Sequence, residues 1–231
     1  MKIIFLNCWE GKLLEPLKQF IEIQKADTDV FCLQEAPSNV QTAFDEVLKS
    51  YSKVSAERAR SGAPGKDFAP AQVTYIRAGI EVVSSSQVSD ASDSGLGLYT
   101  ELSVGTKPVH LLNLHGIPHP GKLDTPARIK QSQTFIDFFK NKVGTRIIGG
   151  DLNVLPETQS VQMFENSGYR DLINEYGIKT TRNRLVWERF PDNPLYYSDY
   201  IFMDRNTTVR NFTVPDMEIS DHLPLILEIQ L

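Results

Sequence analysis

The chain has 231 residues, of which 41% are hydrophobic and 23% are charged, so a packed core is expected and global disorder is excluded. Its net charge of -5 argues against a general duplex-DNA-binding protein, which needs basic side chains to neutralise phosphates. The length suits one large domain and no linker divides it, so residues 1–231 are expected to form a single domain.

The sequence favours a cytoplasmic protein with reduced thiols. No apolar run approaches the roughly 20 residues that span a bilayer, so no membrane association is expected. The apolar run at residues 3–6 ends at Asn7, which makes it too short for the hydrophobic part of a signal peptide. Cys8 and Cys32 each lie in an apolar run and are predicted to be buried and unpaired.

Strand–helix–strand order is predicted in the first part of the chain. Residues 3–6 are continuously apolar, which is typical of a strand buried on both faces. Residues 13–24 carry apolar side chains at helical spacing, and Pro16 lies where the first turn of a helix tolerates it. Residues 29–34 predict a second buried strand, and apolar residues at helical spacing over 40–51 predict a second helix.

A second unit of the same plan is predicted later in the chain. Residues 58–70 combine glycine, proline and charge, and are expected to form an exposed, mobile loop. The further predicted strands are residues 72–77, 81–86, 98–104, 109–114, 146–150, 199–203, 209–214 and 223–229. Thr125 and Pro126 are expected to begin a helix that runs to about residue 142, and a short helix is expected near 157–166. Two such units predict two packed sheets with helices on the outer faces.

Polar residues stand where the predicted strands end or begin. Those at strand ends are Asn7, Glu35, His115, Asp151 and Asn153, and those at strand starts are Asp199, Asp221 and His222. Because the start of an antiparallel strand lies beside the end of its neighbour, all these side chains can share one rim.

Such a rim has the composition of a metal-dependent site. Asn7, Glu35, Asp151, Asn153 and Asp221 offer hard oxygen ligands, which suit Mg²⁺ or Mn²⁺ rather than a metal that prefers thiolates. The two histidines add proton carriers that work near neutral pH. The combination predicts a divalent-metal-dependent phosphoesterase, because phosphoester hydrolysis depends on positioning and charge stabilisation.

The same residues have structural alternatives. Asp151 and Asn153 favour turns, and His222 could be a hydrogen-bonded histidine in a turn. His115 and His119 have the spacing of a zinc-binding pair on a helix, but the glycine and proline between them exclude a regular helix.

The order of the motifs resembles that of the endonuclease/exonuclease/phosphatase superfamily, which is deoxyribonuclease-I-like. The motifs that carry the resemblance are Asn7, Gln34-Glu35, His115, Gly150-Asp151-Leu152-Asn153, Ser198-Asp199-Tyr200-Ile201 and Ser220-Asp221-His222-Leu223-Pro224. The resemblance extends from residue 3 to residue 229. It implies a four-layered α/β sandwich of two mostly antiparallel sheets packed face to face, with helices outside and the active site at one end.

The resemblance also implies a metal end of the site. Glu35 would be the main metal ligand, helped by Asn7, and Asp221 would support the same end. Many nucleases of this group have Asp or Asn two positions after the first Asn, whereas this chain has Trp9. One oxygen ligand is therefore replaced by an aromatic face, which puts a second metal ion in doubt.

Catalytic roles follow from the same resemblance. Asp151 would orient the attacking water or hold a second metal ion, and Asn153 would bond to the phosphate. His222, oriented by Asp199, would contact the scissile phosphate or act as the base. His115 would donate to a phosphate oxygen or to the leaving group.

Several further residues are candidate substrate contacts. Trp9, Arg182, Asn183 and Trp187 offer aromatic faces, an amide and a cation that could line a pocket for an anionic substrate, although a surface loop would have a similar composition. The charged residues of 58–66 favour solvated surface, with closure over the substrate as the alternative.

Other polar residues receive supporting interpretations. His110 is predicted to be structural because it lies in the middle of a strand, and His119 and Lys122 are expected in a loop near the mouth of the site. Arg128 and Gln131 lie one helical turn apart and are expected to pack behind the site, with phosphate contact as the alternative.

The substrate class stays open within the phosphoesters. The negative net charge favours a small or single-stranded nucleic acid, a nucleotide-like molecule or another phosphodiester, and tight duplex DNA binding is not expected. A phosphomonoesterase or a sphingomyelinase-like enzyme is an alternative, but the latter would need an exposed apolar hairpin that the sequence lacks. A catalytically silent interaction module is the alternative from another class. Such a module would be expected to lack Glu35, Asp151 or His222.

Overall fold

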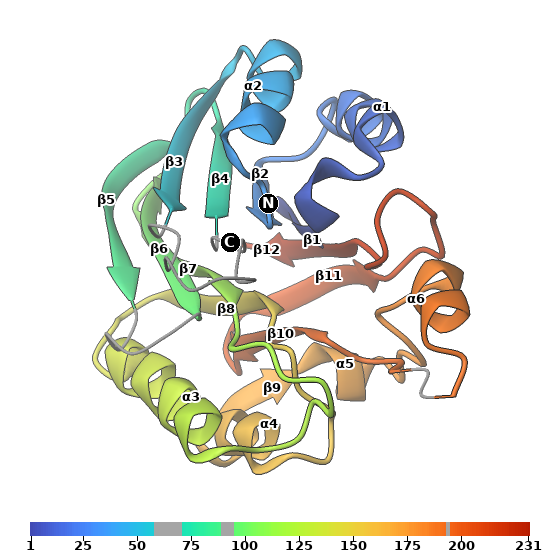
Figure 1. Cartoon of the computed structure of the whole chain (residues 1–231). Coiled ribbons are helices and arrows are strands. Elements are labelled where there is room, and N and C mark those ends of the chain that lie inside the picture. Colours follow the sequence, from blue (N-terminus) through green and yellow to red (C-terminus); the bar gives the residue numbers. More distant parts are fainter. Residues whose placement is uncertain (58–70, 89–94, 193–194) are drawn as a thin grey trace.

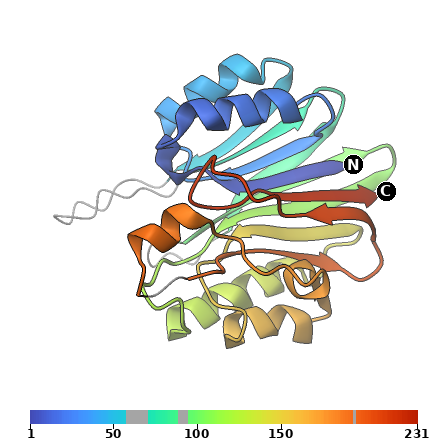
Figure 2. The ribbon, with the colours of Figure 1, turned by 90° about the vertical axis from the view of Figure 1, so that its right-hand side faces the viewer.

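The computed structural model of the protein describes residues 1–57, 71–88, 95–192 and 195–231. Two six-stranded sheets lie face to face, and helices cover both outer faces (Figures 1 and 2). The predicted four-layered sandwich is confirmed. The predicted loop at 58–70 lies outside the described residues. No helix in the described part of the chain is both long and apolar enough to cross a membrane.

The first sheet has the strand order β11-β12-β1-β2-β4-β3. Its strands are β1 (Lys2–Asn7), β2 (Val30–Gln34), β3 (Tyr51–Glu57), β4 (Ala71–Arg77), β11 (Thr208–Thr213) and β12 (Leu225–Gln230). Helices α1 (Leu14–Gln24) and α2 (Ser38–Val47) cover its outer face, where their apolar side chains pack on β1, β2 and β4 (Figure 2). Only β1 and β2 run parallel in this sheet, and α1 connects them.

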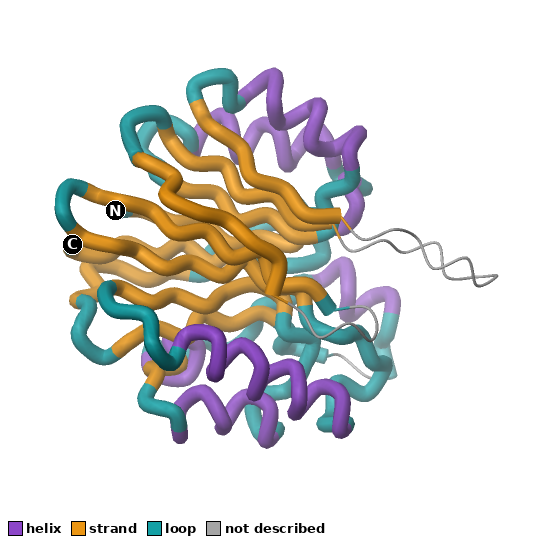
Figure 3. The backbone as a smooth tube through the Cα atoms, turned by 90° about the vertical axis from the view of Figure 1, so that its left-hand side faces the viewer, coloured by secondary structure: helices purple, strands orange, loops and turns teal. Residues whose placement is uncertain are grey.

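The second sheet has the order β5-β6-β7-β8-β10-β9. Its strands are β5 (Glu81–Val88), β6 (Leu96–Val104), β7 (Lys107–His115), β8 (Thr145–Asp151), β9 (Tyr169–Asp171) and β10 (Asp199–Asp204). The remaining helices are η1 (Trp9–Gly11), α3 (Pro126–Phe139), α4 (Gln159–Asn166), α5 (Leu172–Glu175) and α6 (Arg184–Arg189). Helix α3 connects β7 to the parallel strand β8, and with α4 it covers the side opposite α1 and α2 (Figures 2 and 3).

Most predicted elements are present, with boundaries that move by a few residues. The predicted helix cap is confirmed, because the Thr125 hydroxyl accepts a hydrogen bond from the backbone of Arg128. Helix α3 ends at Phe139, short of the predicted residue 142. Cys8 and Cys32 are buried and free, as predicted.

One predicted helix was extended too far. Tyr51 falls at helical spacing from the apolar residues of α2, but α2 ends at Val47 and Tyr51 begins β3. Its ring packs against Phe31, and its hydroxyl donates to the carbonyl of Thr28 at 2.5 Å. Long-range packing therefore decides the conformation of Tyr51. Strands β3 and β9 and helices α5 and α6 are further elements for which no local pattern was identified.

The strand pairing brings the predicted polar strand ends together. In the first sheet Asn7 pairs with Gln34, the residue before Glu35, at the carboxyl ends of two parallel strands. In the second sheet His115 pairs with Asp151 in the same way, and the antiparallel strand β10 begins with Asp199 opposite Asp151. The two sheets thus present these groups at a common edge.

Buried amides bind the two sheets to each other behind that edge. The Gln34 side chain donates to the Asn113 side-chain oxygen at 2.7 Å across the interface. The Asn113 amide in turn donates to the carbonyls of Leu33 and Val73 at 3.2 and 3.1 Å. These directional bonds set the position of one sheet relative to the other, because each buried amide would otherwise lose its partners.

Close packing at Gly149 brings β1 against β8 two residues before Asp151. A Cβ atom at Gly149 would lie 2.8 Å from ring atoms of Phe5, which is closer than real contacts. Glycine therefore allows the Phe5 ring to seat directly on the backbone that leads to Asp151.

Substituting Gly149→Ala is expected to lower the free energy of unfolding by about 1–3 kcal/mol, because the added methyl overpacks the sheet interface. Urea denaturation measures this loss. In a Phe5→Leu background, which removes the opposing ring, the same substitution should cost less. An equal loss in both backgrounds would contradict the assignment of the clash to Phe5.

Candidate active site

A cavity of about 670 Å³ opens at the edge where the polar strand ends meet. Its polar and charged lining residues are Glu10, Lys12, Glu35, His115, His119, Lys122, Asp151, Asn153, Arg182, Arg189, Asp221 and His222. Its apolar and aromatic lining residues are Trp9, Pro118, Pro120, Val186, Phe190 and Leu195. The cavity lining therefore combines charged side chains with apolar ones, and η1 and α6 contribute to it.

Strained backbone concentrates at this cavity. Within the described ranges, the non-glycine residues with positive φ are Trp9, Glu10, Glu35, Lys122 and Asn153, with φ between 47° and 61°. All five line the cavity. Left-handed backbone is unfavourable for residues with a Cβ, and such strain persists where the surrounding structure enforces it. The fold thus keeps the backbone of these lining residues in a conformation that would otherwise be unfavourable.

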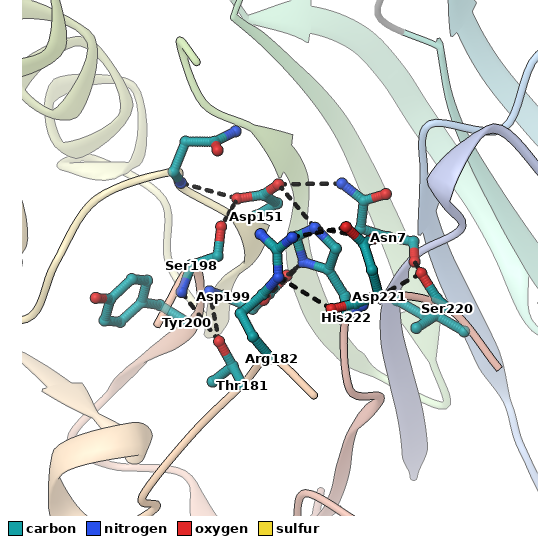
Figure 4. Close-up of polar contacts among 12 residues, drawn as sticks. Asn7, Asp151, Thr181, Arg182, Ser198, Asp199, Tyr200, Ser220, Asp221 and His222 are labelled. Atoms are coloured by element: carbon teal, nitrogen blue, oxygen red, sulfur yellow. Dashed lines mark hydrogen bonds and ion pairs between the residues drawn. The ribbon is translucent and has the colours of Figure 1, made fainter. Parts of the chain in front are cut away.

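Asp151 is the most heavily hydrogen-bonded carboxylate of the cavity (Figure 4). Its Oδ1 accepts from the Ser198 hydroxyl at 2.6 Å and from the Asn153 backbone at 2.8 Å. Its Oδ2 accepts from the Asn7 amide at 3.0 Å. Burial alone raises the pKa of Asp151, but His222, Lys122 and the other neighbours outweigh it and hold the pKa below its usual range. Asp151 is therefore an ionised and firmly oriented carboxylate.

Asp151 and two neighbouring side chains form a group that could hold a cation. Glu35, His115 and Asp151 each offer one ligand atom, and these atoms lie within 4.8 Å of one another. His115 Nε2 lies 3.6 Å from Glu35 Oε1 and 3.7 Å from Asp151 Oδ2. Burial raises the pKa of Glu35, although His115 and His222 oppose this effect. A carboxylate that is costly to ionise in a buried site suits a bound positive ion.

His222 forms the second cluster with Asp151. Its Nδ1 lies 2.9 Å from both carboxylate oxygens of Asp199, and its Nε2 lies 3.7 Å from Asp151 Oδ2 (Figure 4). Burial and Arg182 lower the pKa of His222, but Asp199 and the other carboxylates prevail, so the pKa is raised from its usual value. The bond to Asp199 fixes the ring orientation and directs Nε2 toward Asp151.

Arg182 and Asp221 form a buried ion pair beside His222. The guanidinium donates to Asp221 Oδ2 at 2.7 Å and to the Asp221 backbone carbonyl at 3.0 Å (Figure 4). Asp221 Oδ1 is buried and accepts no hydrogen bond among the described residues, and it lies 3.8 Å from His222 Nε2. Asp221 thus keeps one oxygen available at the cavity. The predicted metal end would place Asp221 beside Glu35, but the group that contains Glu35 consists of Glu35, His115 and Asp151.

The predicted substrate contacts divide into two pairs. Trp9 and Arg182 line the cavity. Asn183 does not, because its side chain caps α6 and donates to the carbonyls of Met217 and Ser220. Trp187 also lies outside the lining and packs against Tyr196 at 5.4 Å between ring centroids. Asn183 and Trp187 therefore stabilise the segment that follows Arg182 and do not line the cavity.

The supporting residues occupy the positions expected from the sequence. His110 bonds to the Tyr99 hydroxyl at 2.9 Å within the sheet, and His119 lines the cavity mouth without joining a metal-binding group in the described part of the chain. Arg128 is buried and donates to the carbonyls of Ile117 and Asn153, which ties together the two loops behind the site. Lys122 was expected only as a loop residue and Phe190 was not a candidate, but both line the cavity.

Comparison with known proteins agrees with this geometry. The sequence model described as "Endonuclease/Exonuclease/phosphatase family" matches residues 6–222. The chain belongs to this family. Its members are hydrolases of phosphoester bonds and generally use divalent metals. A search of curated proteins finds no match.

Solved structures of the same fold cover the whole chain at low identity. An endonuclease/exonuclease/phosphatase from Bacteroides vulgatus is 17% identical, with a TM-score of 0.77 and coverage of 100% of this chain and 98% of the other. A mannosyl-6-phosphatase from Bacteroides thetaiotaomicron is 19% identical, with a TM-score of 0.77 and 100% coverage of both chains. The catalytic domain of human Nocturnin with a bound sulfate anion is 15% identical, with a TM-score of 0.76 and coverage of 100% and 94%. These likenesses establish the fold.

Asp199→Asn is expected to lower the pKa of His222, because it removes the carboxylate that faces Nδ1. The raised pKa of the wild-type imidazole adds stability that is fully present below the unfolded pKa and is lost as pH rises through the folded pKa. The variant should therefore lose more free energy of unfolding at about pH 5 than at about pH 9.

NMR titration of the imidazole in metal-free protein, with urea denaturation at both pH values, measures these effects. Asp216→Asn removes an exposed carboxylate and serves as the matched control. A His222 pKa that stays unchanged or rises in Asp199→Asn would contradict the pairing.

Proposed function

We propose that this protein is a divalent-metal-dependent phosphodiesterase that hydrolyses small or single-stranded phosphodiesters by attack of water. The observation that carries this proposal is the convergence of two groups on Asp151 in one cavity. One is the cluster of Glu35, His115 and Asp151, and the other is the His222–Asp199 pair. The presence of Glu35, Asp151 and His222 together also argues against a catalytically silent interaction module.

The donor set fits a hard divalent cation such as Mg²⁺ or Mn²⁺. Glu35 and Asp151 would hold it, with the Asn7 amide bonded to Asp151 at their side. Carboxylate oxygens are preferred ligands of such ions. The charge balance of the interior supports this, because the buried Asp151, Asp199 and Asp221 and the half-buried Glu35 outnumber the buried basic side chains of the cavity lining, Lys122 and Arg182. A bound cation supplies neutralisation of phosphate charge and activation of water.

His222 is the proposed base. Because Asp199 accepts from Nδ1, the lone pair of Nε2 faces the cavity, where it can take a proton from the attacking water. The raised pKa of the ring makes Nε2 a stronger proton acceptor. His115, on the side of Glu35, is the proposed donor to a phosphate oxygen or to the leaving group.

Two further polar groups are proposed to hold the phosphate. Asn153 and Arg182 line the cavity next to the carboxylate clusters. Their amide and guanidinium hydrogens are suitable donors to phosphate oxygens. Asn153 is held for this purpose, because its backbone donates to Asp151 and its carbonyl accepts from Arg128.

The apolar part of the lining supports a diester in preference to a compact monoester. Trp9, Pro118, Pro120, Phe190 and Leu195 line the same cavity as the charged groups, so that a second ester group can contact them. A monoester would leave these apolar side chains exposed to water. Long duplex DNA is an unfavourable substrate, because a net charge of -5 provides few counterion-releasing contacts.

Removal of divalent metal is expected to abolish hydrolysis of bis-p-nitrophenyl phosphate. Without the cation, the negative charges of the carboxylates and of the phosphate would repel each other. Activity before and after EDTA, and after return of Mg²⁺ or Mn²⁺, measures the effect. The diester should be hydrolysed faster than p-nitrophenyl phosphate. Activity that survives exhaustive chelation would refute the metal requirement, and a preference for the monoester would refute the diesterase assignment.

His222→Ala is expected to lower kcat by at least about 100-fold, which is the usual scale for general acid–base catalysis. Asp199→Asn should give a smaller loss of kcat because it disturbs only the orientation of the ring. The double variant should be no slower than His222→Ala, since both changes act through one imidazole. Steady-state kinetics of the three variants provide the measurement. Losses that multiply would give Asp199 a separate role.

A further inference from the structure

Lys122 is a buried lysine in the wall of the cavity. It lies in the loop between β7 and α3, and only 5% of its surface is exposed. The loop is held by two backbone bonds, from Lys122 to the His119 carbonyl at 3.0 Å and from Leu155 to the Lys122 carbonyl at 2.9 Å. Its φ of 48° is unfavourable for a residue with a side chain. The surrounding structure therefore forces this ammonium group into the interior.

A chain of hydrogen bonds leads from this ammonium to Asp151. Lys122 Nζ donates to the Ser198 hydroxyl at 2.5 Å, and Ser198 Oγ donates to Asp151 Oδ1 at 2.6 Å. An ammonium has only donors, so Ser198 must accept from Lys122 and give its own hydrogen to Asp151. The chain thus has one possible direction. Ser198 is fully buried, so no water competes for its hydroxyl.

The chain determines which face of Asp151 is presented to the cavity. Oδ1 is occupied by Ser198 and by the backbone of Asn153. Oδ2 is the oxygen that lies 3.7 Å from both His115 and His222. A rotation of the carboxylate plane out of this orientation would leave the buried Ser198 hydroxyl without its acceptor, which is unfavourable in the interior.

The ammonium is charged at neutral pH. Burial lowers the pKa of Lys122 to about 8, although Asp151 and other carboxylates oppose this effect. A charged donor at the start of the chain strengthens both bonds, because charge-assisted hydrogen bonds in a low-dielectric interior exceed neutral ones.

We propose that Lys122 is a positioning residue, which acts through Ser198 to fix the Asp151 carboxylate with Oδ2 toward the two histidines. This proposal rests on the phosphodiesterase function proposed above. Since Lys122 also lines the cavity, a direct contact with the substrate phosphate is the competing explanation. The two explanations differ in their kinetics, because positioning affects the reaction step whereas a phosphate contact also affects binding.

The kinetic test compares Lys122→Met, Ser198→Ala and the double variant with Lys140→Met, which makes the same change at an exposed lysine. Each single variant should lower kcat on bis-p-nitrophenyl phosphate by about 10–100-fold, the usual effect of losing a partner behind a functional ligand. KM should change by less than about twofold, and the double variant should be no slower than the slower single variant. Lys140→Met should match the wild type.

A different result would overturn the proposal. If Lys122→Met raises KM severalfold while Ser198→Ala does not, and the two effects multiply, Lys122 acts directly on the substrate. Thermal denaturation of each variant shows whether the fold is retained. Ser198→Ala removes only one oxygen, so it tests the chain even if Lys122→Met fails to fold.

A second measurement is independent of catalysis. In metal-free protein at about pH 6, well below the pKa of its ammonium, Lys122 should give a slowly exchanging NMR signal, because it is buried and hydrogen-bonded. The signal should be absent in Lys122→Met and displaced in Ser198→Ala. If no slowly exchanging lysine signal depends on Ser198, the chain is refuted. If the chain is seen but the wild type hydrolyses no phosphoester, the proposed function fails instead.

Discussion

The hydrogen bond from the Asn7 amide to Asp151 joins the two sheets at the edge where the cavity opens. Asn7 ends β1 of the first sheet, and Asp151 ends β8 of the second. The relative position of the sheets is set farther inside by the Gln34–Asn113 amide bond and by the Phe5 ring seated on Gly149. Any slip between the sheets would separate Asn7 and Glu35 from Asp151 and His115. The face-to-face packing of the sandwich is therefore what assembles the site.

Unbalanced charge is the second constraint on this site. Glu35, Asp151, Asp199 and Asp221 outnumber the buried basic side chains of the lining, and each carboxylate is accommodated differently. Asp221 is paired with Arg182, Asp199 is paired with His222, and Asp151 is surrounded by donors. Burial raises the pKa of Glu35, and the groups that oppose this effect are the two histidines and the Asn7 amide. This uneven distribution explains why the charge of a divalent cation is most useful on the side of Glu35 and Asp151.

Sequence reasoning succeeded where local pattern and sheet geometry determine the outcome. Continuous apolar runs identify β1, β2, β7 and β8, and polar residues at their ends must meet once parallel strands align. It failed where tertiary packing decides. Tyr51 fits a helical period but pairs in a sheet. Lys122 lies in an irregular loop whose path depends on contacts with distant segments, so nothing in its neighbours reveals a buried ammonium. Asn183 and Trp187 have suitable chemistry, but Asn183 bonds to backbone carbonyls and Trp187 packs against Tyr196, so neither lines the cavity.

The five left-handed residues around the cavity have a consequence for adaptation to heat. Four of them, Trp9, Glu10, Glu35 and Lys122, each store roughly 1–2 kcal/mol of backbone strain that the rest of the sandwich must offset, whereas asparagine tolerates this backbone at residue 153. Glycine or asparagine at one of these four positions would relieve strain, but it would remove a side chain that lines the cavity, as Glu35 illustrates. Variants selected only for a higher melting temperature would therefore tend to relax the cavity first. Stabilising substitutions are better placed in the outer helices, where no described non-glycine residue has a positive φ.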